Sequence, residues 1–123
     1  VDIPVYDFRT HTRTGTRKLE PGRIVIVEGI LLFWDAELRS RFDFKIFIDT
    51  DPDIRLIRRL RRDLRRRGRN VDSVLDQWET SVRPAYLRYV DLMKRYADLS
   101  VSGNGSFDEA VESAVRKIEA RIA

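Results

Sequence analysis

The chain contains two short runs of residues that are apolar at nearly every position. Residues 24–27 are Ile-Val-Ile-Val, and residues 44–48 are apolar except at Lys45. A strand that is apolar on both of its faces is typical of a parallel sheet, which helices cover on each side. Because segments with helical signals follow both runs, the pattern predicts an α/β fold with three layers, in which helices flank a parallel sheet.

Turn and capping residues predict where the other elements begin and end. Asp51 and Pro52 have the residue types of a helix N-terminus, and Gly68 is a suitable stop, so one long helix is expected between them. Residues 1–22 are polar and rich in threonine, with proline and glycine among them, and are expected to be mainly loop. The remaining expected elements are helices over 36–41, 71–81, 84–96 and from Phe107 onward, and a strand over 99–102.

Composition excludes several classes of protein. With 42% apolar residues and twelve aromatic ones, the chain can build a packed core and is not a disordered basic tail. It has no cysteine and one histidine, which excludes disulfides, thiolate metal sites and a multi-histidine zinc site within one chain. No apolar run approaches the roughly 20 residues of a membrane span, and no signal peptide opens the chain. A cytoplasmic protein without a membrane partner is therefore expected.

The strongest local feature is a basic block over residues 55–69. It holds nine arginines against one acid, Asp63, so the block has a net charge of +8 whereas the whole chain has +4. Neighbouring guanidinium groups repel one another and destabilise a helix unless negative charge lies nearby. For a single arginine, an ion pair with an acid elsewhere is the favoured interpretation. For the cluster, binding of a nucleotide polyphosphate or a nucleic-acid backbone is favoured.

Acidic residues follow both apolar runs, at the sheet edge where ligands of α/β proteins bind. Glu28 follows residues 24–27, and it is equally suited to hold Mg²⁺ through water or to cap a loop or helix. Asp49 and Asp51 follow the second run. A structural role is favoured for these two acids because Asp51 is expected to be a helix N-cap.

Three rings lie close together in the polar N-terminal segment, at Tyr6, Phe8 and His11. They could line a pocket for a flat base, although an isolated loop histidine is more often a surface residue. None of the six glycines begins the G-x-x-x-x-G-K-[ST] motif of a phosphate-binding loop. These 123 residues therefore do not supply that loop to a triphosphate.

Taken in order, the motifs of the chain resemble those of the uridine kinase (uridine–cytidine kinase) family. The resemblance extends from about Asp2 to the last predicted helix. The matching stretches are Ile3-Pro4-Val5-Tyr6-Asp7-Phe8 with His11-Thr12-Arg13, Val27-Glu28-Gly29-Ile30-Leu31, Phe47-Ile48-Asp49-Thr50-Asp51, Arg55-Leu56-Ile57-Arg58-Arg59, Arg62-Asp63 with Arg67-Gly68-Arg69, Val82-Arg83-Pro84, and Lys94-Arg95-Tyr96-Ala97-Asp98.

The resemblance implies a P-loop NTPase-like kinase of pyrimidine salvage. Such an enzyme transfers the γ-phosphoryl group of ATP or GTP to the 5′-hydroxyl of uridine or cytidine, with Mg²⁺ as cofactor. By the same resemblance, Glu28 lies near the magnesium ion, and Arg62 and Arg67 reach the phosphates of the nucleoside triphosphate. The substrate-binding residues that it implies are Tyr6, Phe8, His11, Ile30, Arg59, Arg69 and Gln77.

The match also implies that part of the kinase is outside these residues. In the family, the phosphate loop and the aspartate taken as general base precede the position that aligns with Val1, so no catalytic residue is assigned here. We expect a single partial kinase domain, incomplete on the N-terminal side of its sheet and inactive by itself. Its expected parts are a nucleoside-side loop (1–22), strands with the metal-side acid (23–51), an arginine-rich lid (52–80), and C-terminal helices with a strand (81–123).

Two other functions compete with this interpretation. One is an arginine-rich module that binds nucleic acid. It is disfavoured, and no nucleic-acid partner is expected, because a simple polycation has no use for Tyr6, His11, Glu28 and Gln77. The other is a related P-loop kinase for another small alcohol, such as phosphoribulose or pantothenate, which the Tyr6 and His11 pair would distinguish. Family members are often oligomeric, so the resemblance allows a homo-oligomer.

Overall fold

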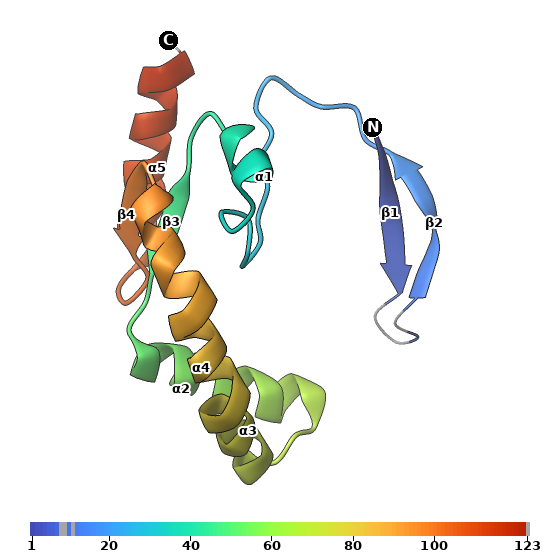
Figure 1. Cartoon of the computed structure of the whole chain (residues 1–123), viewed down its shortest axis with the longest axis vertical. Helices are drawn as coiled ribbons and strands as arrows, with labels where there is room; N and C mark the ends of the chain where they lie inside the picture. The colour runs from blue at the N-terminus through green and yellow to red at the C-terminus, as the bar shows by residue number, and fades with distance from the viewer. Residues whose placement is uncertain (8–9, 11, 123) are drawn as a thin grey trace.

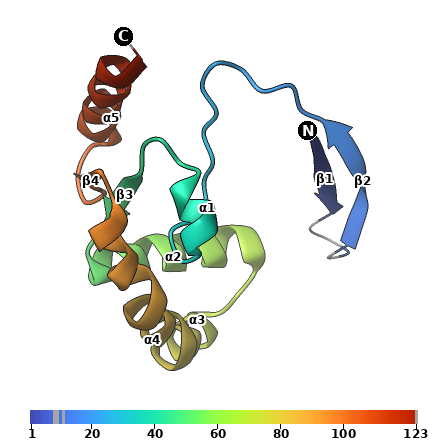
Figure 2. The same cartoon turned by 45° about the horizontal axis from the view of Figure 1, so that its top comes forward.

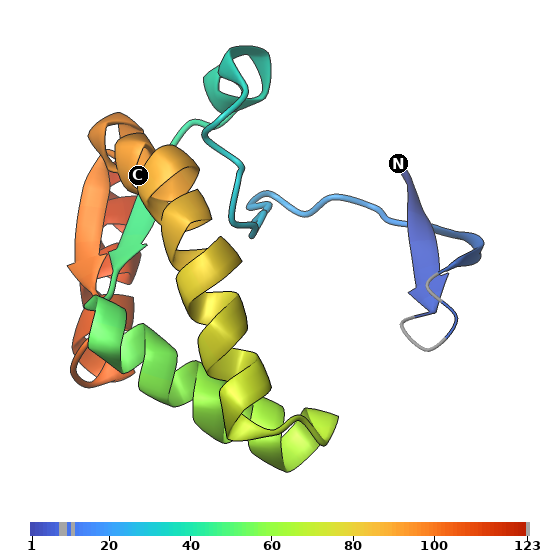
Figure 3. The same ribbon diagram turned by 60° about the horizontal axis from the view of Figure 1, so that its bottom comes forward.

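The computed structural model describes residues 1–7, 10 and 12–122. Two strands near the N-terminus, β1 (Asp2–Asp7) and β2 (Thr12–Lys18), form a hairpin that stands apart from the rest of the chain (Figures 1 and 2). An extended segment and the short helix α1 (Ala36–Ser40) lead from it to a parallel pair of strands, β3 (Ile46–Asp49) and β4 (Leu99–Ser102). Between β3 and β4 in sequence, two helical arms form a V (Figure 3).

The hairpin corrects the expectation of a loop over residues 1–22. β1 and β2 are antiparallel, with Ile3 opposite Arg17 and Val5 opposite Gly15, and the register shifts after Val5. Pro4 indicates a loop at the level of sequence because proline has no backbone N–H to donate. In a two-stranded sheet, however, each strand has an unpaired edge where proline is tolerated.

The apolar run at residues 24–27 is not a strand, contrary to the sequence prediction. It lies in the extended segment before α1, and its side chains are largely exposed, with Ile26 at 83%. Backbone groups in a strand need a neighbouring strand, and none lies beside this run in the part of the chain that the structure describes. The run therefore has strand composition without a strand's hydrogen-bond partners.

β3 and β4 form a parallel sheet of two strands, so the predicted α/β class with a parallel sheet is confirmed, whereas three layers are not seen among the described residues. Ile46 lies opposite Leu99 and Ile48 opposite Val101 in their register. Phe47 and Val101 are buried, but Ile48 is 60% exposed, so the expected burial of both faces is wrong for one of them. The helix α5 (Phe107–Ile122) follows β4 and packs against it. The described residues are thus α/β, with a two-stranded parallel sheet and helices.

The first helical arm is α2 (Pro52–Arg67), and its limits agree with the prediction. Pro52 begins it and Gly68 ends it with φ of 60°, a left-handed conformation that glycine adopts without steric cost. Asp51 is the N-cap residue, but its side chain makes no capping hydrogen bond. Only its backbone carbonyl takes part, by accepting from the N–H of Arg55.

The second arm runs without interruption from residue 71 to residue 96, although Pro84 predicts a boundary or a kink. It consists of α3 (Val71–Gln77), a π-helical turn (Trp78–Val82), α4 (Arg83–Ala85), a second π-helical turn (Tyr86–Val90) and a 3₁₀ turn (Asp91–Tyr96). Proline clashes with the carbonyl four residues earlier in an α-helix. Wider turns before and after Pro84 accommodate it, and the N–H of Arg83 reaches back five residues to the carbonyl of Trp78.

The core of the described residues is small. Its buried apolar side chains are Phe47, Val74, Trp78, Met93 and Val101. Within the described ranges, no helix has both the length and the apolar character needed to cross a bilayer.

Candidate functional site

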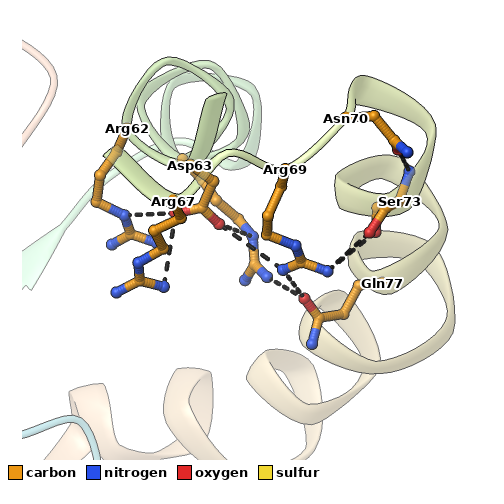
Figure 4. A network of polar contacts seen from close by, with 8 residues as sticks. Arg62, Asp63, Arg67, Arg69, Asn70, Ser73 and Gln77 are labelled. Atoms are coloured by element: carbon orange, nitrogen blue, oxygen red, sulfur yellow. Dashed lines mark hydrogen bonds and ion pairs between the residues drawn. The ribbon is translucent and has the colours of Figure 1, made fainter. Parts of the chain in front are cut away.

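The basic helix α2 encloses one carboxylate, Asp63, whose side chain is 0% exposed. Four guanidinium groups surround it (Figure 4). Arg62 Nε donates a hydrogen bond of 2.8 Å to Oδ1, and Arg67 Nη1 lies 3.6 Å from the same oxygen. Arg59 Nε and Arg69 Nη1 lie 3.6 and 3.9 Å from Oδ2. We call these five residues the arginine–aspartate cluster.

Helical spacing and one glycine produce the cluster. Arg59 and Arg67 are four residues before and after Asp63, so all three side chains lie on one face of α2. Gly68 then reverses the chain: its N–H and that of Arg69 both donate to the backbone carbonyl of Asp63. This reversal brings the side chain of Arg69 back toward the carboxylate from outside the helix.

Gln77, on α3, connects the second arm to the cluster. Its Oε1 accepts hydrogen bonds from Arg59 Nη2 at 2.5 Å and from Arg69 Nη1 at 2.6 Å (Figure 4). Arg69 Nη2 donates in addition to Ser73 Oγ at 2.9 Å. Asn70 begins α3 as its N-cap, because its side chain accepts from the N–H of Ser73. A single amide oxygen thus holds two of the four arginines at a fixed separation.

The charge of the cluster is unbalanced. The hydrogen bond from Arg62 lowers the pKa of Asp63, as do the positive charges of Arg67 and Arg59, and burial opposes them. Asp63 is therefore ionised at neutral pH, and four cations around it leave three positive charges in excess. Arg59 Nε and Asp63 Oδ2 face each other while both lack a hydrogen bond.

The remaining arginines of the basic block divide into two groups. Arg55 Nε donates to the carbonyl of Thr50, and its guanidinium lies 3.4 Å from the centre of the Tyr86 ring. Arg58 donates to the carbonyl of Gly103 at 2.7 Å. These two therefore have structural partners, as the sequence favours for single arginines. Three others are exposed and form no ion pair with a described residue: Arg61, Arg65 and Arg66.

Of the acids that follow the two apolar runs, Asp49 has a structural partner and Glu28 has only a predicted role. Lys94 Nζ forms a hydrogen-bonded ion pair with Asp49 Oδ2, and this hydrogen bond is the main cause that raises the pKa of Lys94. Asp49 therefore has the structural role that the sequence favours. The described residues contain no group of three or more histidine, aspartate or glutamate side chains able to hold a metal ion. The assignment of Glu28 to a magnesium site stays a prediction.

The structure brings together the predicted residues of the lid and leaves the others apart from it. Arg59, Arg62, Arg67, Arg69 and Gln77 meet in one network. The other predicted residues belong to different parts of the chain: Tyr6 to β1, Glu28 to the extended segment before α1, and Ile30 to the turn that follows it. Among the described residues, no hydrogen bond or ion pair joins Glu28 or Ile30 to the network. Phe8 and His11 lie outside the described residues.

The sequence prediction missed Asp63 as a member of the site. The available signal was its position as the only acid among nine arginines, four residues from Arg59 and from Arg67. Such spacing also occurs in ordinary exposed ion pairs on helices, which contribute little to stability. Its complete burial is what distinguishes Asp63 from those pairs.

Comparison with known proteins shows the family to which this chain belongs. Residues 1–108, which include both arms and the whole cluster, match the family model described as "Phosphoribulokinase / Uridine kinase family". The chain belongs to the phosphoribulokinase/uridine kinase family. The resemblance that its motifs carry is thereby confirmed, and membership implies a P-loop NTPase-like fold.

Curated members of the phosphoribulokinase/uridine kinase family are similar over nearly the whole chain. The uridine kinase of Chloroflexus aggregans is 46% identical over 123 residues, which are 99% of this chain and 59% of the relative. That of Streptococcus uberis is 46% identical over 124 residues, which are 100% of this chain and 59% of the relative. That of Ligilactobacillus salivarius is 44% identical over 119 residues, 96% of this chain and 56% of the relative. The chain thus spans about three fifths of the length of these relatives.

Proposed function

We propose that this chain is the nucleoside-side and lid portion of a kinase that phosphorylates the 5′-hydroxyl of uridine or cytidine with ATP or GTP. The relatives that support this proposal are named uridine kinase. The observation that carries it is the convergence of Arg59, Arg69 and Gln77 with Arg62 and Arg67. Arg59, Arg62 and Arg67 belong to α2, Gln77 belongs to α3, and Arg69 lies in the connection between the two helices. Together they form one cationic site.

The chemistry of phosphoryl transfer suits such a site. The transition state spreads negative charge over the oxygens of the transferred group, and enzymes stabilise it mainly by positioning cations and donors. Arg62 and Arg67 would contact the triphosphate, because their side chains are 48% and 58% exposed and so accessible to it. Arg59 and Arg69, with Gln77, would contact the nucleoside, together with Tyr6, Phe8, His11 and Ile30.

Magnesium would be held with the help of Glu28. A single carboxylate fits this ion, because Mg²⁺ keeps most of its water ligands and is bound through one or two carboxylates and substrate phosphates. Glu28 is exposed and belongs to no cluster of acids among the described residues, which agrees with such a water-rich site. When bound, the ion would neutralise charge on the phosphates.

A chimeric enzyme tests the proposal. This chain would replace the aligned part of the Chloroflexus aggregans relative, and formation of ADP would be followed with and without uridine. We expect ATP consumption that depends on uridine, and a loss of about 10²- to 10³-fold in kcat/KM for Arg62→Ala, the size found on removing one transition-state donor. Arg61→Ala is the matched control, because Arg61 lies next to Arg62 on α2 outside the cluster.

The same chimera separates the competing functions. A folded chimera that consumes ATP with another small alcohol but not with uridine or cytidine would exclude the pyrimidine assignment. Binding of RNA or DNA that weakens steeply with salt, without any kinase activity, would favour a nucleic-acid-binding module instead.

A further inference from the structure

Asp63 is a residue to which the proposed function gives no role. It is an anion at the centre of a site that is to bind anions, and it occupies Arg62 and Arg67, which are to contact phosphate. An acid at such a position reduces the positive charge available to a ligand. Its complete burial and its contact with all four arginines indicate that it affects their arrangement.

Asp63 has four arginine partners, but it forms a hydrogen bond with only one of them. Only Arg62 reaches hydrogen-bond distance, at 2.8 Å, and the other three guanidinium groups stay at 3.6–3.9 Å. At these separations the attraction of opposite charges persists, but no N–H is consumed. Arg62 uses only Nε on the carboxylate, so its two terminal nitrogens make no hydrogen bond to any described residue. The carboxylate therefore attracts Arg67 by charge and Arg62 through Nε, and it leaves their terminal nitrogens as donors for a ligand. The terminal nitrogens of Arg59 and Arg69 donate instead to Gln77 and Ser73.

We infer that Asp63 is a positioning residue, an internal counter-ion that keeps the four arginines of the cluster together and presents the terminal N–H donors of Arg62 and Arg67 to phosphate. This inference rests on the proposed function for the identity of the ligand. Without the carboxylate, Gln77 still joins Arg59 and Arg69, but Arg62 and Arg67 lose the anion that holds them and are repelled by the other guanidinium groups. With it, the group still has three positive charges in excess, enough to attract a polyphosphate.

The inference predicts that removing the charge of Asp63 leaves the affinity for a polyphosphate equal or higher, but disorders the arrangement of the arginine side chains. Asp63→Asn keeps the volume of the side chain and removes one negative charge. Attraction of a polyphosphate is then equal or stronger, while the arginines lose their fixed arrangement. Damage to the fold would instead weaken both.

The first experiment uses this chain alone, with ¹⁵N labelling and tripolyphosphate as the probe. We expect dispersed, slowly exchanging arginine Nε–H resonances in the unsubstituted chain, led by that of Arg62, and their collapse in Asp63→Asn. By calorimetry, Asp63→Asn should bind tripolyphosphate no more weakly than the unsubstituted chain does. Asp53→Asn is the matched control, since Asp53 is exposed on the same helix, and it should leave the resonances unchanged. Dispersed resonances in Asp63→Asn would overturn the inference.

The second experiment links positioning to catalysis in the chimera. We expect Asp63→Asn to lower kcat about 10- to 100-fold, with the KM for ATP unchanged or lower, because only the transition state depends on exact donor placement. An unchanged kcat, or a raised KM at constant kcat, would contradict the inference. If Asp63→Asn does not fold, Asp63→Glu replaces it: it retains the charge, so its resonances must stay dispersed. An inactive unsubstituted chimera would refute the proposed function and leave the resonance experiment decisive for Asp63.

Discussion

Gln77 illustrates how a neutral side chain can organise two charged ones. Its Oε1 accepts from both Arg59 and Arg69, and these bonds join the helices α2 and α3. A carboxylate in its place would cancel part of the positive charge that the proposed function requires. An amide oxygen orients the two guanidinium groups and leaves their charge intact.

Replacement of Gln77 should therefore affect stability and orientation together. We expect Gln77→Leu to lower the free energy of unfolding by about 1 kcal/mol, the usual net value of a lost hydrogen-bond acceptor at a partly exposed site. Urea unfolding monitored by circular dichroism measures this. Asp76→Asn, a change at the neighbouring exposed residue, is the control and should leave the midpoint unchanged. A Gln77→Leu midpoint equal to that of the unsubstituted chain would show that the two bonds add nothing to stability.

At the scale of elements, the corner between α2 and α3 depends on Gly68. A Cβ at this position would meet no atom within 4 Å, so the cost of a side chain there is conformational and comes from φ of 60°. We expect Gly68→Ala to destabilise the chain by about 1–2 kcal/mol, the cost of the left-handed region for an L-residue. Gly68→Asn should cost less, since asparagine tolerates this region.

Gly105→Ala provides the control for the corner. Gly105 also has open space around it, and it is not among the glycines with positive φ. Its replacement should change the urea midpoint little. Equal changes in the urea midpoint for Gly68→Ala and Gly105→Ala would show that the left-handed conformation of Gly68 does not determine the cost of a side chain at the corner between α2 and α3.

The elements that could be predicted from the sequence are those whose signals are local. The residues at the two ends of α2 act on their own neighbours, so Pro52 and Gly68 locate it correctly. The run at residues 24–27 is different, because a strand exists only through a neighbour that the run itself does not specify. The four arginines of the cluster and Gln77 are predicted as site residues from the family resemblance. Asp63 is missed because its spacing alone does not distinguish it from an exposed ion pair, and its burial also depends on the reversal at Gly68.

At the scale of the whole molecule, the accessible surface is large for the mass. The chain exposes 9932 Å² at 14.5 kDa. A compact monomer of that mass exposes roughly 6,900 Å². The hairpin stands apart from the helices, and the extended segment runs between them, in Figures 1 and 2. The segment and the turn after it contain two runs of neighbouring exposed apolar side chains: Ile24, Val25, Ile26 and Val27, and then Ile30 and Leu31.

This surface predicts how the 123-residue chain behaves in isolation. Contiguous exposed apolar residues with unpaired backbone groups associate with other apolar surfaces. We expect the isolated chain to bind the dye ANS and to self-associate with increasing concentration in sedimentation velocity. Ile26→Lys combined with Val27→Lys should reduce both, because charged side chains oppose pairing along the segment. Leu87→Lys, a change at an exposed apolar residue outside the segment, should not. A monomeric chain that binds no ANS would mean that the segment is covered in solution by other residues of the same chain.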